Sequence, residues 1–391
     1  MKQLKHKYLI SIAVVLIFTP GAFLSAGEAE ETFLIKASKI YTSGPEGVLH
    51  NVHLLIEEGR IKKIIQGEEL PSVPVKDYSG KCLVPGVVDA HSYLSGYYRL
   101  LENTEVITSD LITFAAFDPL SPEVQDALSS GITSVNFVPR NENLVGGVSS
   151  VFKLSKRIGN LPFLKKEAFL KISFNAEVVR DDRAPTSLMG TEEILSKKMS
   201  SVKENSERER EGIFQEEGIR KLLKGSLQPM IAASTFEEIN TALMWLDKWN
   251  LKGIIVGGEE AYRFSEILME REIPVLLTPL QFSLPEKIAK NAVLLLKQGI
   301  KIAFTSDMPE GEPLGLRLSA LLLYHQGASA EEAIKTITIL PAQILEVADS
   351  IGSIEEGKDA DFVVFSGEPL DLSSKIEAVY LNGQLVFPEE K

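Results

Sequence analysis

The chain has 391 residues, of which 44% are hydrophobic and 24% charged, so it can bury a large core and falls in the ordinary globular class. Its formal net charge is −13, and −16 once residues 1–26 with their three lysines are set aside, which disfavours binding to nucleic-acid phosphates. Cys82 is the only cysteine, which excludes an internal disulfide and a cysteine-based zinc cluster.

The amino terminus has the three parts of a secretory signal peptide. Lysines precede the apolar run 8–18, and small residues at 25–27 come before an acidic stretch. The run is shorter than the roughly 20 residues that span a membrane, which disfavours an uncleaved anchor. We therefore predict that residues 1–26 are a signal peptide, that the exported protein is periplasmic or secreted, and that membrane contact occurs only through this peptide.

Short alternating runs separated by glycine turns occupy residues 32–84, as expected for strands rather than helices. The same pattern returns in residues 351–388. Neither segment buries enough apolar surface alone, so we predict that both ends of the chain meet in one small β-sandwich domain.

Residues 85–350 alternate apolar, β-branched runs with helical patterns, as in a parallel sheet covered by helices. The eight candidate strands are 84–90, 134–138, 151–154, 168–174, 230–233, 253–256, 274–277 and 302–305. The segment is close to the size of a closed (β/α)8 barrel, about 250 residues. The predicted fold class is therefore α/β: a TIM-like barrel with a small β-sandwich.

Residues 192–224 depart from this rhythm because they are dense in charge and sparse in apolar positions. The pattern predicts a solvated helix pair or a helical insertion over the barrel. A role as a lid or a partner-binding segment is the alternative, and nothing in the sequence requires it.

Several motifs resemble the amidohydrolase superfamily of metal-dependent hydrolases. Residues 85–91, Pro-Gly-Val-Val-Asp-Ala-His, resemble its first barrel strand, Pro-Gly-x-x-Asp-x-His-x-His. Residues 143–147 resemble an Asn-x-x-Gly-Gly turn of the secreted, imidazolonepropionase-like subgroup. Residues 302–309 resemble the last barrel strand of the superfamily, and residues 327–361 resemble its carboxyl-terminal tail. The resemblance covers nearly the whole mature chain, and it implies the barrel and the sandwich built from both termini.

The resemblance also implies a metal site at the mouth of the barrel. The superfamily places two histidines on the first strand, often a carboxylated lysine, two histidines on middle strands, and a proton-shuttling aspartate on the last strand. His91 matches the first histidine and Asp307 the aspartate, whereas Tyr93 replaces the second histidine. Lys171 is the candidate for the carboxylated lysine, and Lys153 is the alternative.

The middle-strand histidines are missing, since the matching positions lie near Ala233 and Gly257. The other four histidines fall in the signal peptide, the sandwich and a helical run: His6, His50, His53 and His325. A four-histidine binuclear centre therefore cannot be assembled, and we predict a degenerate metal site. Its expected cofactor is one divalent metal (zinc, manganese or iron) or none, and both alternatives stay open.

The predicted site residues follow from this placement. Asp307 is the predicted catalytic residue. The predicted metal-binding residues are His91, Asp307 and Lys171, and the predicted substrate-binding residues are Tyr93, Asn143 and Glu259. The alternative for His91 and Asp307 is a hydrogen-bonded pair without metal, and a Lys171–Asp307 ion pair would then replace the metal.

Two functions are compatible with these sequence features. The first is an exported amidohydrolase that cleaves a C–N bond in an amide, a cyclic amide or a dipeptide-like substrate. The second is a non-catalytic relative that uses the barrel for binding or assembly in the cell envelope. The expected partner is a small molecule, with no nucleic acid, and a homo-oligomer is left open.

Overall fold

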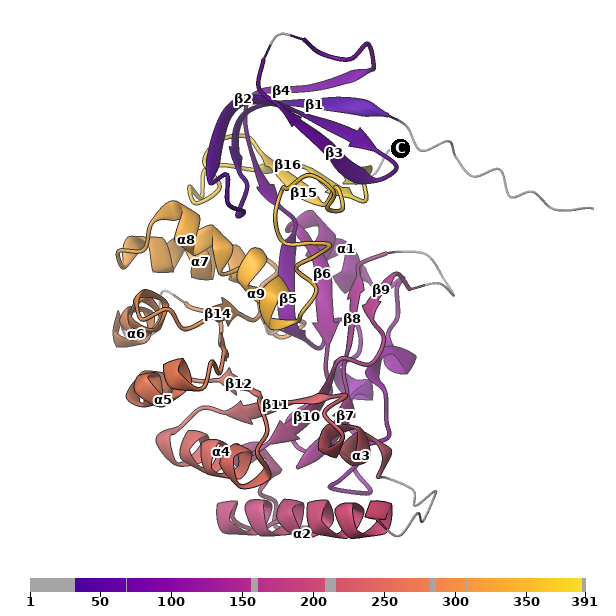
Figure 1. Ribbon diagram of the computed structural model, residues 1–391, viewed down its shortest axis with the longest axis vertical. Helices are drawn as coiled ribbons and strands as arrows, with labels where there is room; N and C mark the ends of the chain where they lie inside the picture. The colour runs from indigo at the N-terminus through magenta and orange to yellow at the C-terminus, as the bar shows by residue number, and fades with distance from the viewer. Residues whose placement is uncertain are drawn as a thin grey trace, which may run out of the picture.

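The computed structural model describes residues 32–67, 69–155, 161–207, 216–281, 286–306 and 308–388. A β-sheet part lies at one end of the molecule and a larger part of strands and helices at the other (Figure 1). Within the described ranges, we find no helix with the length and apolar character needed to span a bilayer. The predicted signal peptide lies outside the described residues.

Strands from both ends of the chain form one seven-stranded sheet, in the order β17-β16-β15-β4-β1-β2-β3. The strands are β1 (Phe33–Tyr41), β2 (Val48–Glu57), β3 (Arg60–Ile65), β4 (Val75–Pro85), β15 (Phe362–Phe365), β16 (Ile376–Leu381) and β17 (Gln384–Phe387). The central strand β4 runs parallel to β1 on one side and antiparallel to β15 on the other. The two segments predicted to meet therefore share this sheet.

Both faces of the β4–β15 pair are buried. Leu83 and Phe362 pack into the core of the sheet itself, whereas Cys82 and Val363 pack on the opposite face with Ile334 of helix α8 (Ala330–Lys335). This division follows from the alternation of side chains along a strand. Burial raises the pKa of the Cys82 thiol to about 12, and the buried cysteine is a packing residue.

The larger part contains two sheets whose long strands are mainly parallel. One sheet pairs β5 (Val87–Ser92) with β6 (Ile132–Phe137), β8 (Ser150–Lys153) and β9 (Phe163–Lys165). The other contains β7 (Val145–Val148), β10 (Phe169–Ser173), β11 (Gln228–Ala233), β12 (Ile254–Gly257), β13 (Val275–Leu277) and β14 (Ile302–Phe304). Each of the eight predicted strands overlaps one of these elements.

The direction of the third predicted strand, 151–154, is wrong. It corresponds to β8, which runs antiparallel to β6, whereas the sequence predicts a parallel barrel strand. A parallel return requires a long crossover, usually a helix. Here β7 and β8 form one extended stretch interrupted only by Ser149, and the chain passes from one sheet into the other at that residue.

The two sheets share one hydrophobic core and are linked by backbone hydrogen bonds at both edges. At one edge, Ser149 N donates to Phe169 O at 2.9 Å. At the other edge, Val88 N of β5 donates to Ile337 O at 2.9 Å, and Phe304 N of β14 donates to Thr336 O at 3.4 Å. The segment after α8 thus bridges β14 and β5, where no strand ladder joins them in the described residues.

Helices follow β5, β10, β11, β12, β13 and β14 and lie on the outer side of the sheets (Figure 1). They are α1 (Pro122–Ser129), α2 (Leu188–Glu207), α3 (Glu217–Leu223), α4 (Phe236–Trp249), α5 (Ser265–Glu270), α6 (Glu286–Lys297), α7 (Gly315–His325), α8 and α9 (Ile339–Ile344), with short 3-10 helices η1 (Tyr97–Arg99), η2 (Thr113–Ala116), η3 (Ala176–Val178) and η4 (Ala261–Phe264). Helix α4 begins directly after β11, because Thr235 and Glu238 form a capping box there.

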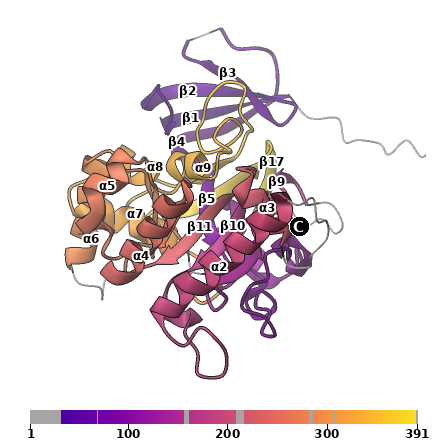
Figure 2. The ribbon, with the colours of Figure 1, turned by 60° about the horizontal axis from the view of Figure 1, so that its bottom comes forward.

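The charged stretch 192–224 forms most of α2 and α3, which connect β10 to β11. Helix α3 packs on β10, and α2 packs on α3 and α4 (Figure 2). Leu195, Met199 and Ile219 enter the main core, so the sparse apolar positions are the buried stripe of amphipathic helices. The described part of the stretch is therefore the predicted helix pair, and it serves as the crossover connection from β10 to β11 rather than as an insertion.

Candidate functional site

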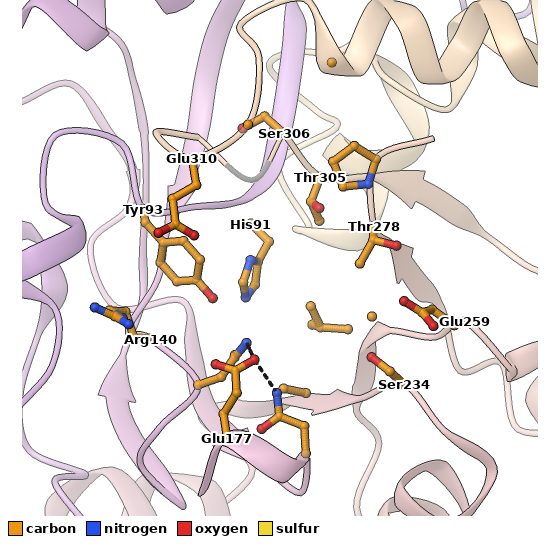
Figure 3. Close-up of a pocket in the computed structure, with 18 of the residues that line it drawn as sticks. His91, Tyr93, Arg140, Glu177, Ser234, Glu259, Thr278, Thr305, Ser306 and Glu310 are labelled. Atoms are coloured by element: carbon orange, nitrogen blue, oxygen red, sulfur yellow. Dashed lines mark hydrogen bonds between the residues drawn. The ribbon is translucent and has the colours of Figure 1, made fainter. Parts of the chain in front are cut away.

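A cavity of about 800 Å³ opens at the carboxyl ends of the parallel strands. Its lining comes from β5 and from the segments that follow β6, β10, β11, β12, β13 and β14. Figure 3 shows His91 at the centre of this cavity, with labelled side chains around it. In α/β sheets and barrels this end of the strands carries the binding site, because the loops there are free to vary.

His91 and Lys171 contact each other at the base of the cavity. His91 on β5 is 3% exposed and Lys171 on β10 is fully buried, and Lys171 Nζ lies 2.6 Å from His91 Nε2. Burial and the positive charge of Lys171 hold the pKa of His91 well below its usual range. The imidazole is therefore neutral, and its Nε2 accepts a hydrogen bond from the ammonium group. The structure thus brings together two of the three predicted metal-binding residues.

Asp307, the predicted catalytic residue and third metal-binding residue, lies outside the described residues. The Lys171–Asp307 ion pair and the His91–Asp307 pair therefore stay predictions. The described residues before it, Thr305 and Ser306, line the cavity.

Tyr93 lies beside His91, at the position that the family motif assigns to the second histidine. Its ring is nearly perpendicular to the His91 ring, with centroids 5.2 Å apart, and it packs in the same way on Tyr97 at 5.7 Å. The Tyr93 side chain is 9% exposed and forms part of the cavity wall. Its packing fits the predicted contact with a substrate and fills space next to the imidazole.

Asn143 is placed differently from its predicted role, because it does not line the cavity. Its Nδ2 donates to Glu102 O at 2.8 Å, and its Oδ1 accepts from Arg183 at 2.7 Å. Both atoms of the amide are thus used to hold surrounding loops, and we assign Asn143 a structural role instead. Glu259, after β12, is exposed and lines the cavity, where a substrate can reach it.

Lys153, the alternative to Lys171, lies outside the site. Its Nζ is 2.7 Å from a carboxylate oxygen of Asp359 and 2.7 Å from one of Asp361. These ion pairs attach β8 to the carboxyl-terminal strands of the seven-stranded sheet. The structure therefore selects Lys171 as the lysine of the candidate site.

Asp89 is a buried carboxyl group close to the cavity that was not predicted as a site residue. Burial raises its pKa to about 6, although hydrogen bonds from Ser306 and Ser92 and from backbone N–H groups act in the opposite direction. Ser306 Oγ donates to Asp89 Oδ2 at 2.5 Å, and Ser306 N donates to Oδ1 at 3.2 Å. Asp89 thus ties the end of β5 to the segment after β14. Its place in the Pro-Gly-x-x-Asp-x-His motif was the available signal.

Five charged lining residues were also not predicted from the sequence. They are Arg140, Glu142, Glu177, Glu310 and Glu312. Each follows a strand, Glu177 in the short helix η3 and the others in loops, and no motif or spacing in the sequence marks these positions as neighbours of His91.

The described residues do not fit the binuclear metal centre that the family resemblance implies. His91 Nε2 is bonded to the Lys171 ammonium, and an ammonium group has no lone pair for a metal. At the end of β12, Gly257 has a φ of 96°, and a Cβ there would collide with Ser234 Oγ, so a histidine does not fit at this backbone. Across the described ranges, no three His, Cys, Asp or Glu side chains converge to hold a metal ion.

Comparisons with known proteins agree with the motifs. A family model described as "Amidohydrolase family" matches residues 291–387. An imidazolonepropionase of Fusobacterium nucleatum is 24% identical over 394 residues, covering 88% of this chain and 93% of that protein. The amidohydrolase tasK of Hapsidospora irregularis is 22% identical over 390 residues, covering 86% of this chain, which spans only 40% of that relative.

Solved structures extend the comparison to the fold. A crystal structure of an amidohydrolase from Thermotoga maritima MSB8 is 31% identical, with a TM-score of 0.85, and covers 91% of this chain and 99% of its own. A Xaa-Pro dipeptidase structure with bound methionine is 16% identical, has a TM-score of 0.59 and supports the fold alone. High coverage of the Thermotoga protein at this identity, together with the site at the strand ends, shows that the chain belongs to the amidohydrolase family.

Proposed function

We propose that the protein hydrolyses a C–N bond in a small polar molecule held in the cavity. The observation that carries this proposal is the cavity itself, which lies at the strand ends of an amidohydrolase fold with His91 at its base. Imidazolonepropionases among the relatives support C–N bonds as the target. The cavity volume of about 800 Å³ suits a substrate of small-molecule size.

We also propose the finer features that the sequence predicts. The two bridged sheets are interpreted as a (β/α)8 barrel in which β7 and β8 interrupt the parallel order. The lysine-led apolar segment within residues 1–26 supports export to the periplasm or the medium.

The proposed reaction places the substrate carbonyl beside His91. Water adds to the carbonyl carbon, the C–N bond breaks, and the nitrogen leaves with a proton. Asp307 is the proposed catalytic residue: it takes a proton from the attacking water and delivers one to the leaving nitrogen. Lys171 is a positioning residue, because it contacts the neutral His91 imidazole from outside the cavity lining.

We propose that this site is depleted of metal ligands compared with the family pattern. The support is the donor set: an imidazole whose Nε2 is bonded to Lys171, and strand ends that carry Ala233 and Gly257. The proposed reaction therefore uses only side chains of the protein. The content of bound zinc, manganese or iron is measured in the experiment below.

The test is hydrolysis of a panel of dipeptides, acylated amino acids and cyclic amides by the purified protein. We expect amine release by the native chain and a decrease of about 10²-fold or more for Asp307→Asn, with ligand binding unchanged. Asp182→Asn is the control, because Asp182 is an exposed residue paired with Arg180. Metal content is measured on the same samples after growth with zinc, manganese and iron.

A non-catalytic binding or assembly protein is the second candidate function. The contact between Lys171 and His91 favours it, because it engages the imidazole nitrogen that metal or proton transfer would use. Binding of panel members without turnover, equal for the native chain and Asp307→Asn, would decide for this function and against hydrolysis.

A further inference from the structure

We infer that the cavity selects a molecule that carries a positive charge, such as an ammonium, amidinium or guanidinium group. This inference rests on the proposed function, because it specifies the substrate class of the same cavity. Among the described lining residues, five are glutamates and one is an arginine. His91 adds no charge, because its pKa is held below its usual range.

Three of the glutamates approach the cavity from different strands. Glu177 follows β10, Glu259 follows β12 and Glu310 follows β14, and Figure 3 shows them on three sides of His91. Carboxylates that converge on one concave space add their fields, and the protein walls focus that field into the cavity. A cation is therefore attracted into the cavity, and an anion is repelled.

The arginine does not offset this charge for a ligand. The Arg140 guanidinium donates to Glu142 Oε1, and its central carbon lies 3.9 Å from the centre of the Tyr97 ring. Arg140 is thus engaged by a carboxylate and an aromatic face. The remaining four lining glutamates have no cation among the described lining residues to neutralise them, and the buried Lys171 ammonium lies behind the lining, bonded to the His91 imidazole.

Two asparagine side chains add partial negative charge to the lining beside Glu177. Asn141 Nδ2 and Asn175 Nδ2 donate to Glu177 Oε1, at 3.4 and 3.0 Å, which turns each amide oxygen away from that carboxylate. In the described structure, Asn141 Oδ1, Asn175 Oδ1 and Glu142 Oε2 are buried oxygens without a hydrogen-bond donor. Uncompensated acceptors of this kind are costly, and a nearby positive charge stabilises them.

The aromatic residues of the wall fit the same type of ligand. Tyr93 and Tyr97 both line the cavity. Burial and the hydrogen bond to Glu310 raise the pKa of Tyr97 to about 12, so the phenol stays neutral and adds no charge of its own. Neutral aromatic rings beside carboxylates are a common binding arrangement for organic cations.

The test uses three planar molecules of matched shape: benzamidine, which is cationic, benzamide, which is neutral, and benzoate, which is anionic. Calorimetry or ligand-observed NMR on the native chain should give an affinity for benzamidine at least about tenfold above that for benzamide, with benzoate weakest. Added salt should weaken benzamidine binding and leave benzamide binding unchanged.

Two variants should change this affinity in opposite directions. Glu259→Gln removes a carboxylate and should weaken benzamidine binding about threefold to tenfold, whereas Arg140→Gln releases Glu142 and should strengthen it. Loss of folding cannot produce the second result. Glu193→Gln is the control, because Glu193 lies on the exposed face of α2 and pairs with Lys197.

Equal binding of benzamidine and benzamide, tighter binding of benzoate, or no benzamidine binding at millimolar concentration would overturn the inference. Each of these results is independent of turnover. Hydrolysis of neutral amides without cation selection would leave the proposed function standing, and cation selection without hydrolysis would leave this inference standing.

Discussion

Replacing the buried Asp89 by asparagine should make the protein more stable near neutral pH. Burial raises the pKa of Asp89 from 3.8 to about 6, so the folded state keeps this proton over a pH range in which the unfolded state has lost it. Folding stability therefore falls as the pH rises from about 4 to about 6. The difference between the folded and unfolded pKa values of Asp89 corresponds to about 3 kcal/mol of the free energy of unfolding. This stabilisation is lost once the pH exceeds both pKa values.

The asparagine variant lacks this titration and keeps the shape of the side chain. Its Oδ1 can still accept from Ser306 N, and its Nδ2 can donate to Ser306 Oγ. We expect the free energy of unfolding of Asp89→Asn, taken relative to that of the native chain, to increase by about 3 kcal/mol between pH 4 and pH 7. Urea unfolding at several pH values measures this difference.

Ser306→Ala provides the opposite perturbation. The hydrogen bond from Ser306 lowers the pKa of Asp89, so its removal should raise that pKa further and steepen the loss of stability with rising pH. Parallel pH profiles for the native chain and Asp89→Asn would refute the reasoning, because they would mean that Asp89 titrates alike in both states.

Three further perturbations test other contacts. Lys171→Met removes the positive charge next to His91 and should raise the pKa of that imidazole, which an NMR titration of its ring nitrogens detects; an unchanged pKa would contradict the contact. Lys153→Met leaves the buried Asp361 carboxylate without its cation, while the partly exposed Asp359 keeps its pair with Arg60, and should lower the free energy of unfolding by about 3–5 kcal/mol in urea; a loss below about 1 kcal/mol would mean that the Lys153–Asp361 pair is exposed to solvent. Gly218→Ala puts a Cβ against the carbonyl oxygen of Ser109 and should cost about 1–3 kcal/mol, seen as a lower melting temperature, and an unchanged value would show that α3 can shift.

The strands were predictable because their signals are local. Alternating and β-branched runs mark strands whatever their partners are, so each predicted run of the larger part overlaps a strand. Strand direction is not local, which is why 151–154 was predicted as parallel although β8 is antiparallel to β6. Direction depends on the path of the connecting chain, and Ser149 alone separates β8 from β7.

Residues of the candidate site could be predicted only where a sequence motif marked them. His91 lies at the cavity as the first-strand motif predicts. The choice between Lys171 and Lys153 could not be made from sequence, because both occupy apolar strands and the pairing of those strands decides where each ammonium lies. Glu177 in η3 and Glu310 in a loop follow different strands, and their convergence depends on the order of the whole sheet, so no local pattern could indicate them.

The pairing of Pro85 with Phe362 has a consequence for how the protein is made. A ribosome completes nearly the entire polypeptide before β4 can acquire its second neighbour, so the emerging chain carries an open strand edge throughout synthesis. Such an edge is a template on which other extended chains can pair until the final strands arrive. Nonsense mutations that remove only β15 to β17 should thus yield an aggregating product rather than a shortened but folded one.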